Sequence, residues 1–275
     1  MSDVCGIIAG AGSFPLHVAR EAKRRGLKVV AIGLQHWVDP ALAQEVDVYE
    51  EVAVGQLERL LARLHTHQVR QAVMAGKVTK EVLFDSRVQF DSEALGILGR
   101  VNDYSVNGLL GAIATRLAKD GVTLLDSSTF LKDQLCPAGV LTRRQPTAAE
   151  QGDIQIGLQV ARRIAELDVG QTVVVKQRVV VAVEALEGTD AAIRRAGELA
   201  RGGGLVVVKM AAPAQDMRFD LPVLGPQTLS VVTQAGATCL AVEAQKTLLL
   251  DKDALLAQAD AAQLCLVGVG AGTTP

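Results

Sequence analysis

The stretch DVCGIIAGAGSFPLHVAREAKRRGLKVVAIG, residues 3–33, indicates how the first half of the chain folds. Its apolar run 3–9 predicts a strand. Residues 14–26 carry apolar side chains at helical spacing, with basic residues in the last turn and Gly26 at the end, which predicts a helix. The apolar run 27–33 predicts a second strand. A strand, a helix and a strand in succession favour a parallel sheet with a right-handed crossover.

The same alternation continues through an amphipathic helix (55–67), a strand (70–76), a helix near 103–119 and a strand (122–125). We therefore predict an α/β fold that begins with a Rossmann-like, nucleotide-binding parallel-sheet domain over residues 1–131. The turn-rich, basic segment 132–148 is expected to be a linker.

A second α/β domain, expected to be catalytic, is predicted over residues 149–275. Two β-branched runs in QTVVVKQRVVVAVEA (171–185) predict a β-hairpin. A hairpin beside further strands indicates a mixed sheet. The other expected elements are a helix at 149–166, strands at 204–209, 238–243 and 263–268, and helices at 190–201, 226–236 and 252–261.

The composition excludes several classes of protein. The 275 residues include 28 basic and 30 acidic residues, so the net charge of −2 argues against a nucleic-acid partner. The four cysteines lack the paired spacing of a zinc site and fit a reducing compartment. Because no apolar run reaches the roughly 18 residues of a membrane span, we expect a cytoplasmic protein. Contact with a membrane surface is compatible with these features.

A glycine-rich turn follows the first strand and contains Gly10, Gly12 and Ser13. Glycines there let the backbone approach a ligand, and the helix N-terminus offers N–H groups to a phosphate. The dinucleotide fingerprint is incomplete, because Pro15 stands at its third glycine and no acidic residue ends the second strand. These departures disfavour an NAD-linked oxidoreductase. A phosphate or ribose contact and a plain turn both fit the spacing.

An acidic cluster follows the apolar run of the predicted hairpin. Its residues lie where a strand of an α/β sheet ends and a helix begins, which is where ligands bind. The alternative is that Thr189 or Asp190 only caps the helix. Two arginines one turn further along are placed to reach a phosphate or to face water. The candidate residues here are Glu187, Gly188, Thr189, Asp190, Arg194 and Arg195.

The segment KMAAPAQDMRFDLPVLGP (209–226) raises a similar choice. In an extended chain, Asp216, Arg218 and Asp220 would point to one side, where they could hold Mg²⁺ and a phosphate together. The alternative is a solvated loop with a weak ion pair. We favour a site, because the Lys209 ammonium ends an apolar strand and two prolines stiffen the loop.

Five stretches resemble the LpxI family, the UDP-2,3-diacylglucosamine pyrophosphatases. They cover nearly the whole chain in order: GIIAGAGSFP (6–15), LDVGQTVVV (167–175), VVAVEALEGTDAAIRRAGEL (180–199), QDMRFDLPVLGPQTL (215–229) and AVEAQKTLLLDKDALLAQAD (241–260).

The resemblance implies Mg²⁺-dependent hydrolysis of UDP-2,3-diacylglucosamine to 2,3-diacylglucosamine 1-phosphate (lipid X) and UMP, in lipid A biosynthesis. Water would attack the phosphorus on the sugar side. The family also implies two domains with the site between them, a homodimer, and a cytoplasmic protein peripheral to the inner membrane. The alternatives are a non-catalytic nucleotide-sugar binding protein and a nucleotide-sugar transferase.

The resemblance and the residue patterns above together lead to a hypothesis about the role of each candidate residue. Asp216 and Asp220, together with Asp190, are expected to hold Mg²⁺, and Asp220 is the preferred alternative as the base that orients water. Lys209 and Arg218 are expected to offset charge on the phosphate oxygens. The substrate-binding residues would be Gly10, Gly12, Ser13, Glu187, Gly188, Thr189, Arg194 and Gln215. The chain has Ala212-Pro213 where such sequences often have Lys-Pro, so one cation near the pyrophosphate is missing.

Overall fold

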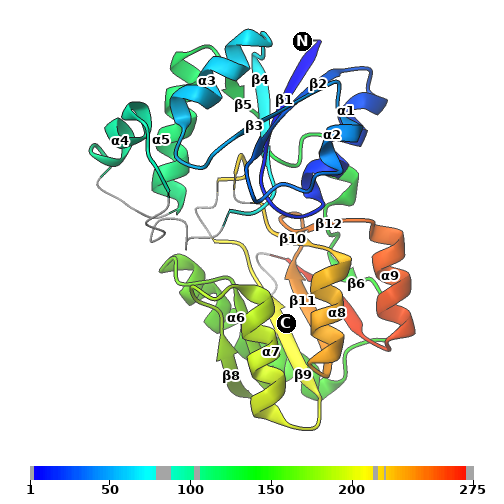
Figure 1. The fold of residues 1–275 in the computed structure, drawn as a ribbon. Helices are drawn as coiled ribbons and strands as arrows, with labels where there is room; N and C mark the ends of the chain where they lie inside the picture. Colours follow the sequence, from blue (N-terminus) through cyan, green and yellow to red (C-terminus); the bar gives the residue numbers. More distant parts are fainter. Residues whose placement is uncertain (1–2, 79–87, 102–105, 213–215, 220, 271–275) are drawn as a thin grey trace. The chain divides into compact units, whose positions relative to one another are not determined.

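The computed structural model describes residues 3–78, 88–101, 106–212, 216–219 and 221–270. Gln215 and Asp220, both predicted site residues, lie outside the described residues. The chain forms two compact units (Figure 1). The first comprises Met1–Lys132 and Asp216–Asp220, and the second comprises Asp133–Gln215 and Leu221–Pro275.

The first unit is built on a five-stranded sheet in the order β3-β2-β1-β4-β5, in which every neighbouring pair is parallel. The predicted parallel sheet is therefore confirmed. The elements of this unit are β1 (Val4–Ala9), α1 (Phe14–Arg24), β2 (Lys28–Leu34), α2 (Leu42–Glu45), β3 (Val48–Val52), α3 (Leu57–Thr66), β4 (Gln71–Ala75), α4 (Ser92–Leu98), α5 (Val106–Lys119) and β5 (Thr123–Leu124).

The core of the first unit follows from the apolar periodicity of its sequence. Strand β1 is covered on both faces, so five of its six residues are buried. Helix α3 buries one stripe of leucines, at positions 57, 60, 61 and 64, against the sheet. Each buried leucine contributes roughly 1.5–3 kcal/mol to the stability of this unit.

The second unit contains a six-stranded mixed sheet in the order β6-β13-β11-β9-β7-β8. Strands β9, β11 and β13 are parallel, β7 is antiparallel to both β8 and β9, and β6 is antiparallel to β13. This confirms the predicted mixed sheet. The strands are β6 (Gly139–Val140), β7 (Thr172–Lys176), β8 (Val179–Val183), β9 (Leu205–Lys209), β11 (Ala237–Glu243) and β13 (Cys265–Val269), with β10 (Val223–Leu224) and β12 (Leu248–Leu249) in a separate parallel pair.

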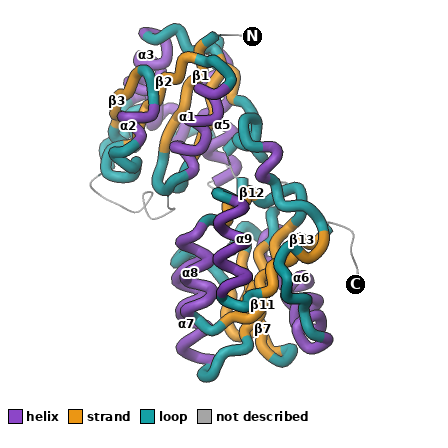
Figure 2. Tube along the Cα trace, turned by 90° about the vertical axis from the view of Figure 1, so that its right-hand side faces the viewer, coloured by secondary structure: helices purple, strands orange, loops and turns teal. Residues whose placement is uncertain are grey.

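Helices cover both faces of this sheet (Figure 2). Helices α7 (Thr189–Ala200), α8 (Pro226–Gln234) and α9 (Lys252–Ala261) cover one face, where Ile193, Leu229 and Leu255 are completely buried. Helix α6 (Ala148–Glu166) covers the other face. The segment 132–148, expected to be a linker, contains the 3-10 turn η2 (Lys132–Gln134) and supplies strand β6 to this sheet.

The topology brings polar residues to one edge of the second sheet. Because β7 is antiparallel to both of its neighbours, β8 and β9 run in the same direction, and β11 runs parallel to β9. The carboxyl ends of β8, β9 and β11 therefore meet at one edge, and α7 begins there after β8. We call this the carboxyl edge of the second sheet.

Candidate functional site

A chain of hydrogen bonds at the carboxyl edge joins three of the elements that meet there. The Lys209 ammonium, on the last residue of β9, donates to Thr189 Oγ1 at 2.8 Å. Thr189, the first residue of α7, donates in turn to Glu184 Oε1 at 3.0 Å. All three side chains are half-buried. The network holds the ammonium of Lys209 at the start of α7, where the free N–H groups of the helix also attract anions.

The side chains at the start of α7 do not cap the helix. The N-cap residue is Gly188, which has a φ of 82° and offers no side chain to the first turn. Thr189 instead contacts Lys209 and Glu184, and Asp190 Oδ1 accepts a hydrogen bond from Thr228 of α8 at 3.2 Å. The capping alternative is therefore wrong, and both side chains take part in contacts between elements.

The two arginines of α7 differ in their surroundings. Arg195 donates to Glu187 Oε1 at 2.7 Å and to the carbonyl of Val183 at 2.9 Å. Burial would raise the pKa of the Glu187 carboxyl, but hydrogen bonds from the backbone and from Arg195 outweigh it and lower that pKa below its usual value. Arg194 is exposed. Arg195 thus orders the loop that precedes α7, a role that the sequence left open.

Glu243 belongs to the same edge and was not among the predicted residues. Glu243 is the last residue of β11 and is only 3% exposed. Its Oε2 accepts a hydrogen bond from the backbone N–H of Ala211 at 2.9 Å. Lys246 pairs with Oε1 at 3.1 Å. Glu243 therefore fixes the chain two residues beyond Lys209. The sequence feature that could have identified Glu243 is a carboxylate directly after an apolar strand pattern.

The segment that carries Asp216 forms a turn, so the prediction of an extended chain is wrong for its described residues. The Phe219 N–H donates to the Asp216 carbonyl at 3.2 Å, and the Arg218 N–H donates to Asp216 Oδ1 at 3.0 Å. The Arg218 guanidinium folds back onto the Asp216 carboxylate, with contacts of 2.9 and 2.6 Å. These hydrogen bonds hold the pKa of the Asp216 carboxyl below its usual range. Arg218 thus already pairs with the carboxylate that was expected to bind metal.

This turn packs with the first unit, although the sequence places it in the second domain. The Ser127 N–H donates to the Met217 carbonyl at 2.8 Å, and the Ser127 hydroxyl contacts the carbonyls of Arg218 and Met74. Phe219 packs against the apolar core of the first unit. The structure thus brings Asp190, Thr189 and Lys209 together in the second unit and assigns Asp216 and Arg218 to the first.

The glycine-rich turn after β1 is held against the end of β4. Gly10 N–H donates to the Ala75 carbonyl at 2.8 Å, and a Cβ at position 10 would meet the Lys77 carbonyl oxygen at 2.8 Å. Gly10 is therefore required for close backbone packing. Gly12 has a φ of 92°, and a Cβ at that position would have no atom within 4 Å. Open space for a ligand therefore lies at position 12, and the exposed Ser13 beside it is the N-cap of α1 without a side-chain capping hydrogen bond.

Within either unit, the described residues contain no group of three His, Cys, Asp or Glu side chains arranged to hold a metal ion. Mg²⁺ usually keeps several waters and needs only one or two carboxylates plus substrate phosphates. Asp190 and Asp216 offer the oxygen ligands that Mg²⁺ prefers. Each of these carboxylates, Asp190 in the second unit and Asp216 in the first, could by itself supply one oxygen ligand to an ion that takes its other ligands from water and from substrate phosphates.

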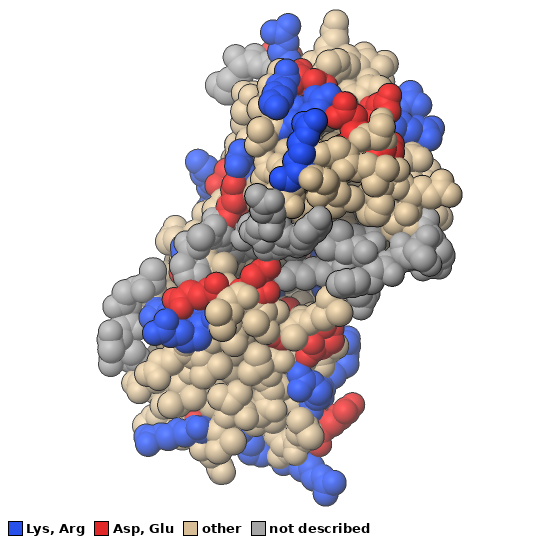
Figure 3. All heavy atoms as spheres, turned by 90° about the vertical axis from the view of Figure 1, so that its left-hand side faces the viewer, with Lys and Arg blue, Asp and Glu red and all other residues tan. Residues whose placement is uncertain are grey.

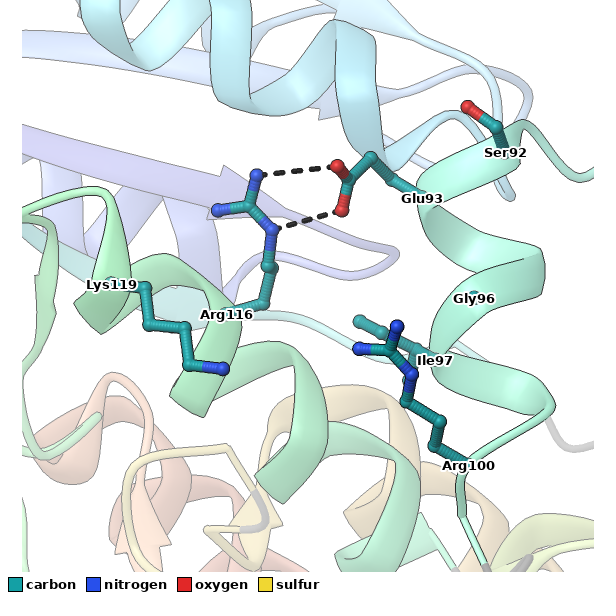
Figure 4. Close-up of a pocket in the computed structure, with 7 residues that line it drawn as sticks. All are labelled: Ser92, Glu93, Gly96, Ile97, Arg100, Arg116 and Lys119. Atoms are coloured by element: carbon teal, nitrogen blue, oxygen red, sulfur yellow. Dashed lines mark hydrogen bonds and ion pairs between the residues drawn. The ribbon is translucent and has the colours of Figure 1, made fainter.

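A hollow of about 360 Å³ in the first unit is lined by residues of α4 and α5 and by Arg100 (Figure 4). Arg116 is one of its lining residues, and its guanidinium pairs with Glu93 at 2.9 Å and with Asp120 at 2.5 Å. Because these carboxylates already satisfy the guanidinium, the hollow is a weaker candidate for an anionic substrate than the carboxyl edge. Its lining residues are Ser92, Glu93, Gly96, Ile97, Arg100, Arg116 and Lys119.

The fold and the polar carboxyl edge define a two-unit α/β protein with features suited to an anionic, phosphate-bearing ligand. Comparison with known families is specific. Residues 4–134 match the LpxI N-terminal domain, and residues 137–267 match the LpxI C-terminal domain. The chain is also 30% identical, over 96% of each sequence, to the UDP-2,3-diacylglucosamine pyrophosphatase LpxI of Caulobacter vibrioides. The chain belongs to the LpxI family.

Solved structures show only distant likeness. Gox2253 has a TM-score of 0.35 and 11% identity, over 98% of this chain and 78% of its own. The biotin carboxylase domain of a thermophilic 2-oxoglutarate carboxylase has a TM-score of 0.29 and 13% identity, over 63% of this chain and 35% of its own. Scores this low carry no information about function. Among the described helices, none is both long and apolar enough to cross a membrane.

Proposed function

We propose that this protein hydrolyses the pyrophosphate bond of UDP-2,3-diacylglucosamine, giving 2,3-diacylglucosamine 1-phosphate and UMP in lipid A biosynthesis. The observation that carries the proposal is the match of both halves of the chain to LpxI domains, together with a relative that carries this activity in its name. The Lys209 ammonium, held by Thr189 at the N-terminus of α7, supports it, because a cation at the start of a helix attracts a phosphate.

The roles of the described residues follow from charge. Hydrolysis of a phosphoric anhydride adds water across one P–O bond, and negative charge develops on the phosphate oxygens. The Lys209 ammonium, oriented by Thr189, would offset that charge. The N-terminus of α7 presents backbone N–H groups beside it, and these would bind a second phosphate oxygen. Arg218 would contribute only to the extent that it leaves its pair with Asp216.

Magnesium is part of the proposal. Asp190 and Asp216, with Asp220, would hold Mg²⁺, which would neutralise the pyrophosphate and align it for attack. Asp216 keeps a depressed pKa through its hydrogen bonds from Arg218, so it is ionised at neutral pH and able to bind a cation.

The proposal is tested by incubating the purified chain with UDP-2,3-diacylglucosamine and measuring release of UMP, with and without EDTA. We expect release that needs no acceptor and that stops when EDTA removes the metal. Release that requires an acceptor would identify a transferase, and binding without release would identify a nucleotide-sugar binding protein. Release that persists in EDTA would contradict the magnesium requirement but not the hydrolysis.

Two further properties are proposed from family membership. A diacylated substrate resides in a membrane, so we propose peripheral contact with the bilayer that carries it. We also propose a homodimer. Co-sedimentation with lipid vesicles tests the first, and molar mass in solution tests the second.

A further inference from the structure

Ser127, a residue of the first unit, binds the backbone of the turn formed by residues 216–219. This turn is part of the first unit, although most of the chain after residue 132 belongs to the second. The Ser127 N–H donates to the Met217 carbonyl at 2.8 Å, and the Ser127 hydroxyl lies 2.8 Å from the Arg218 carbonyl. Phe219 adds an apolar contact with the core of the first unit. Two successive carbonyls of the turn are therefore held by one serine.

Ser127 continues the pairing of β4 beyond the short strand β5. Strand β5 has only two residues, and the chain after it still pairs with β4 through the Leu125 N–H, which donates to the Ala72 carbonyl at 2.9 Å. Because carbonyls along a strand point alternately to its two sides, the next carbonyl on this side belongs to Met74. The Ser127 hydroxyl lies 2.7 Å from that carbonyl, and Ser127 is only 1% exposed. Its one proton is therefore shared between the end of β4 and the turn.

The loop that carries Ser127 is itself held in place, as a residue that positions another must be. The Asp126 carboxylate accepts hydrogen bonds from the N–H and the hydroxyl of Ser128, at 2.7 and 2.5 Å. Arg25, the C-cap residue of α1, donates to the Phe130 carbonyl at 2.7 Å, and its guanidinium lies 5.3 Å from the centre of the Phe130 ring. The loop is therefore fixed both from within and from the end of α1, and Ser127 offers the turn a rigid support.

The hydrogen bonds within the turn fix its shape but not its place. Arg218 binds Asp216 through both its backbone and its side chain, and both residues belong to the turn, so these bonds tie it to nothing else. On the face of the first unit that Figure 3 shows, basic and acidic side chains are intermingled, so no broad field of one sign draws an acidic turn into place there. Ser127 and Phe219 supply contacts that do place it.

We propose that Ser127 is a positioning residue for the hydrolysis: by holding the backbone of the turn, it fixes where the Asp216 carboxylate stands on the first unit. The inference rests on the proposed function, in which Asp216 is a ligand of Mg²⁺. This ion demands near-ideal octahedral geometry, and a misplacement of about 1 Å near the reacting groups can cost roughly 100-fold in rate. Ser127 acts through the turn and not on the substrate.

Hydrogen exchange in the full chain, followed by NMR, tests this anchor without any substrate. The amides of Arg218 and Phe219 are both hydrogen-bonded within the turn, so their exchange reports its opening. Ser127→Ala should speed their exchange about tenfold, because the carbonyls that the hydroxyl serves lose their donor, and should leave the amides of β1 unchanged. The matched control is Ser128→Ala, which removes a hydroxyl from a residue that is also buried, 3% exposed, and that binds Asp126 instead of the turn.

Kinetics of UMP release on the same variants test the consequence for the reaction. We expect Ser127→Ala to lower kcat about tenfold or more and to raise the Mg²⁺ concentration for half-maximal rate about tenfold, whereas Ser128→Ala stays within about threefold of wild type in both. Unchanged exchange at the turn would overturn the proposal. So would faster exchange with kcat and Mg²⁺ dependence unaltered, or an equal loss of protection in β1. If the wild-type chain releases no UMP, the proposed function fails, and the exchange data alone decide whether Ser127 holds the turn.

Discussion

The Thr189 hydroxyl is the centre of the hydrogen-bonded network at the carboxyl edge, and Thr189→Val removes it. This hydroxyl accepts from the Lys209 ammonium at 2.8 Å and donates to Glu184 Oε1 at 3.0 Å. Valine has nearly the same shape but can do neither. The substitution therefore leaves packing at the start of α7 almost unchanged and removes two hydrogen bonds to charged groups.

The magnitude follows from the burial of the partners. A hydrogen bond to a charged group contributes about 1.5–3 kcal/mol. Lys209 and Glu184 are half-buried, so water replaces part of what the hydroxyl supplied. We expect the free energy of unfolding to fall by about 2 kcal/mol, which for a chain of this length lowers Tm by roughly 4–8 °C. Thr189→Ser keeps the hydroxyl and should stay within about 0.5 kcal/mol of the wild-type protein.

Under the proposed function, the same change leaves the Lys209 ammonium without its orienting partner. We expect kcat for UMP release to fall about 100-fold for Thr189→Val, as when one donor to a developing charge is lost. Thr189→Ser should restore most of it. Tm by circular dichroism and steady-state kinetics on the same preparations separate the two effects. If Thr189→Val matches the serine variant in both Tm and kcat, the reasoning about this network is refuted.

Two further predictions concern ionised groups in the two units. Glu150→Ala should lower the free energy of unfolding by about 3 kcal/mol at neutral pH in chemical denaturation, because it removes a buried carboxylate that binds Arg144 at 2.7 Å and Thr238 at 2.6 Å. Burial would raise the pKa of Glu150, but these hydrogen bonds outweigh it and lower the pKa, so the contribution is present above the ordinary pKa and is lost as pH falls through the lowered one. A difference between variant and wild type that grows on acidification would contradict this. Arg218→Ala should let the pKa of Asp216 rise towards its usual value, followed by NMR of its carboxyl carbon, with less than about 1 kcal/mol lost in stability because the pair is partly exposed. An unchanged titration of Asp216 would exclude Arg218 as the cause of its low pKa.

The strands and helices with strong apolar patterns were predictable, and those defined by distant partners were not. The runs VVVKQRVVV predicted the β7–β8 hairpin correctly. Its turn residues, Gln177 and Arg178, have φ of 50° and 64°, which neither residue favours. The Asp153 carboxylate accepts both of their N–H groups, at 3.0 and 2.6 Å, and so stabilises the turn from another element. Strand β3 was missed because its charged VYEEV pattern suits an edge, not a core.

The candidate site shows the same limit. Sequence spacing predicted that Asp216 and Arg218 lie on one side of an extended chain. The segment instead forms a turn whose backbone carbonyls accept hydrogen bonds from Ser127, about ninety residues earlier in the sequence, and local spacing cannot reveal so distant a partner.

Lys209 could be predicted as a site residue from the sequence, because burying an ammonium at the end of an apolar strand costs free energy unless another group pairs with it. The same reasoning applies to Glu243, which follows the apolar strand β11 beside β9 and is more deeply buried than Lys209. In a parallel sheet, a charged residue at the carboxyl end of any buried strand is therefore an equally strong candidate for a site residue, whatever its sign.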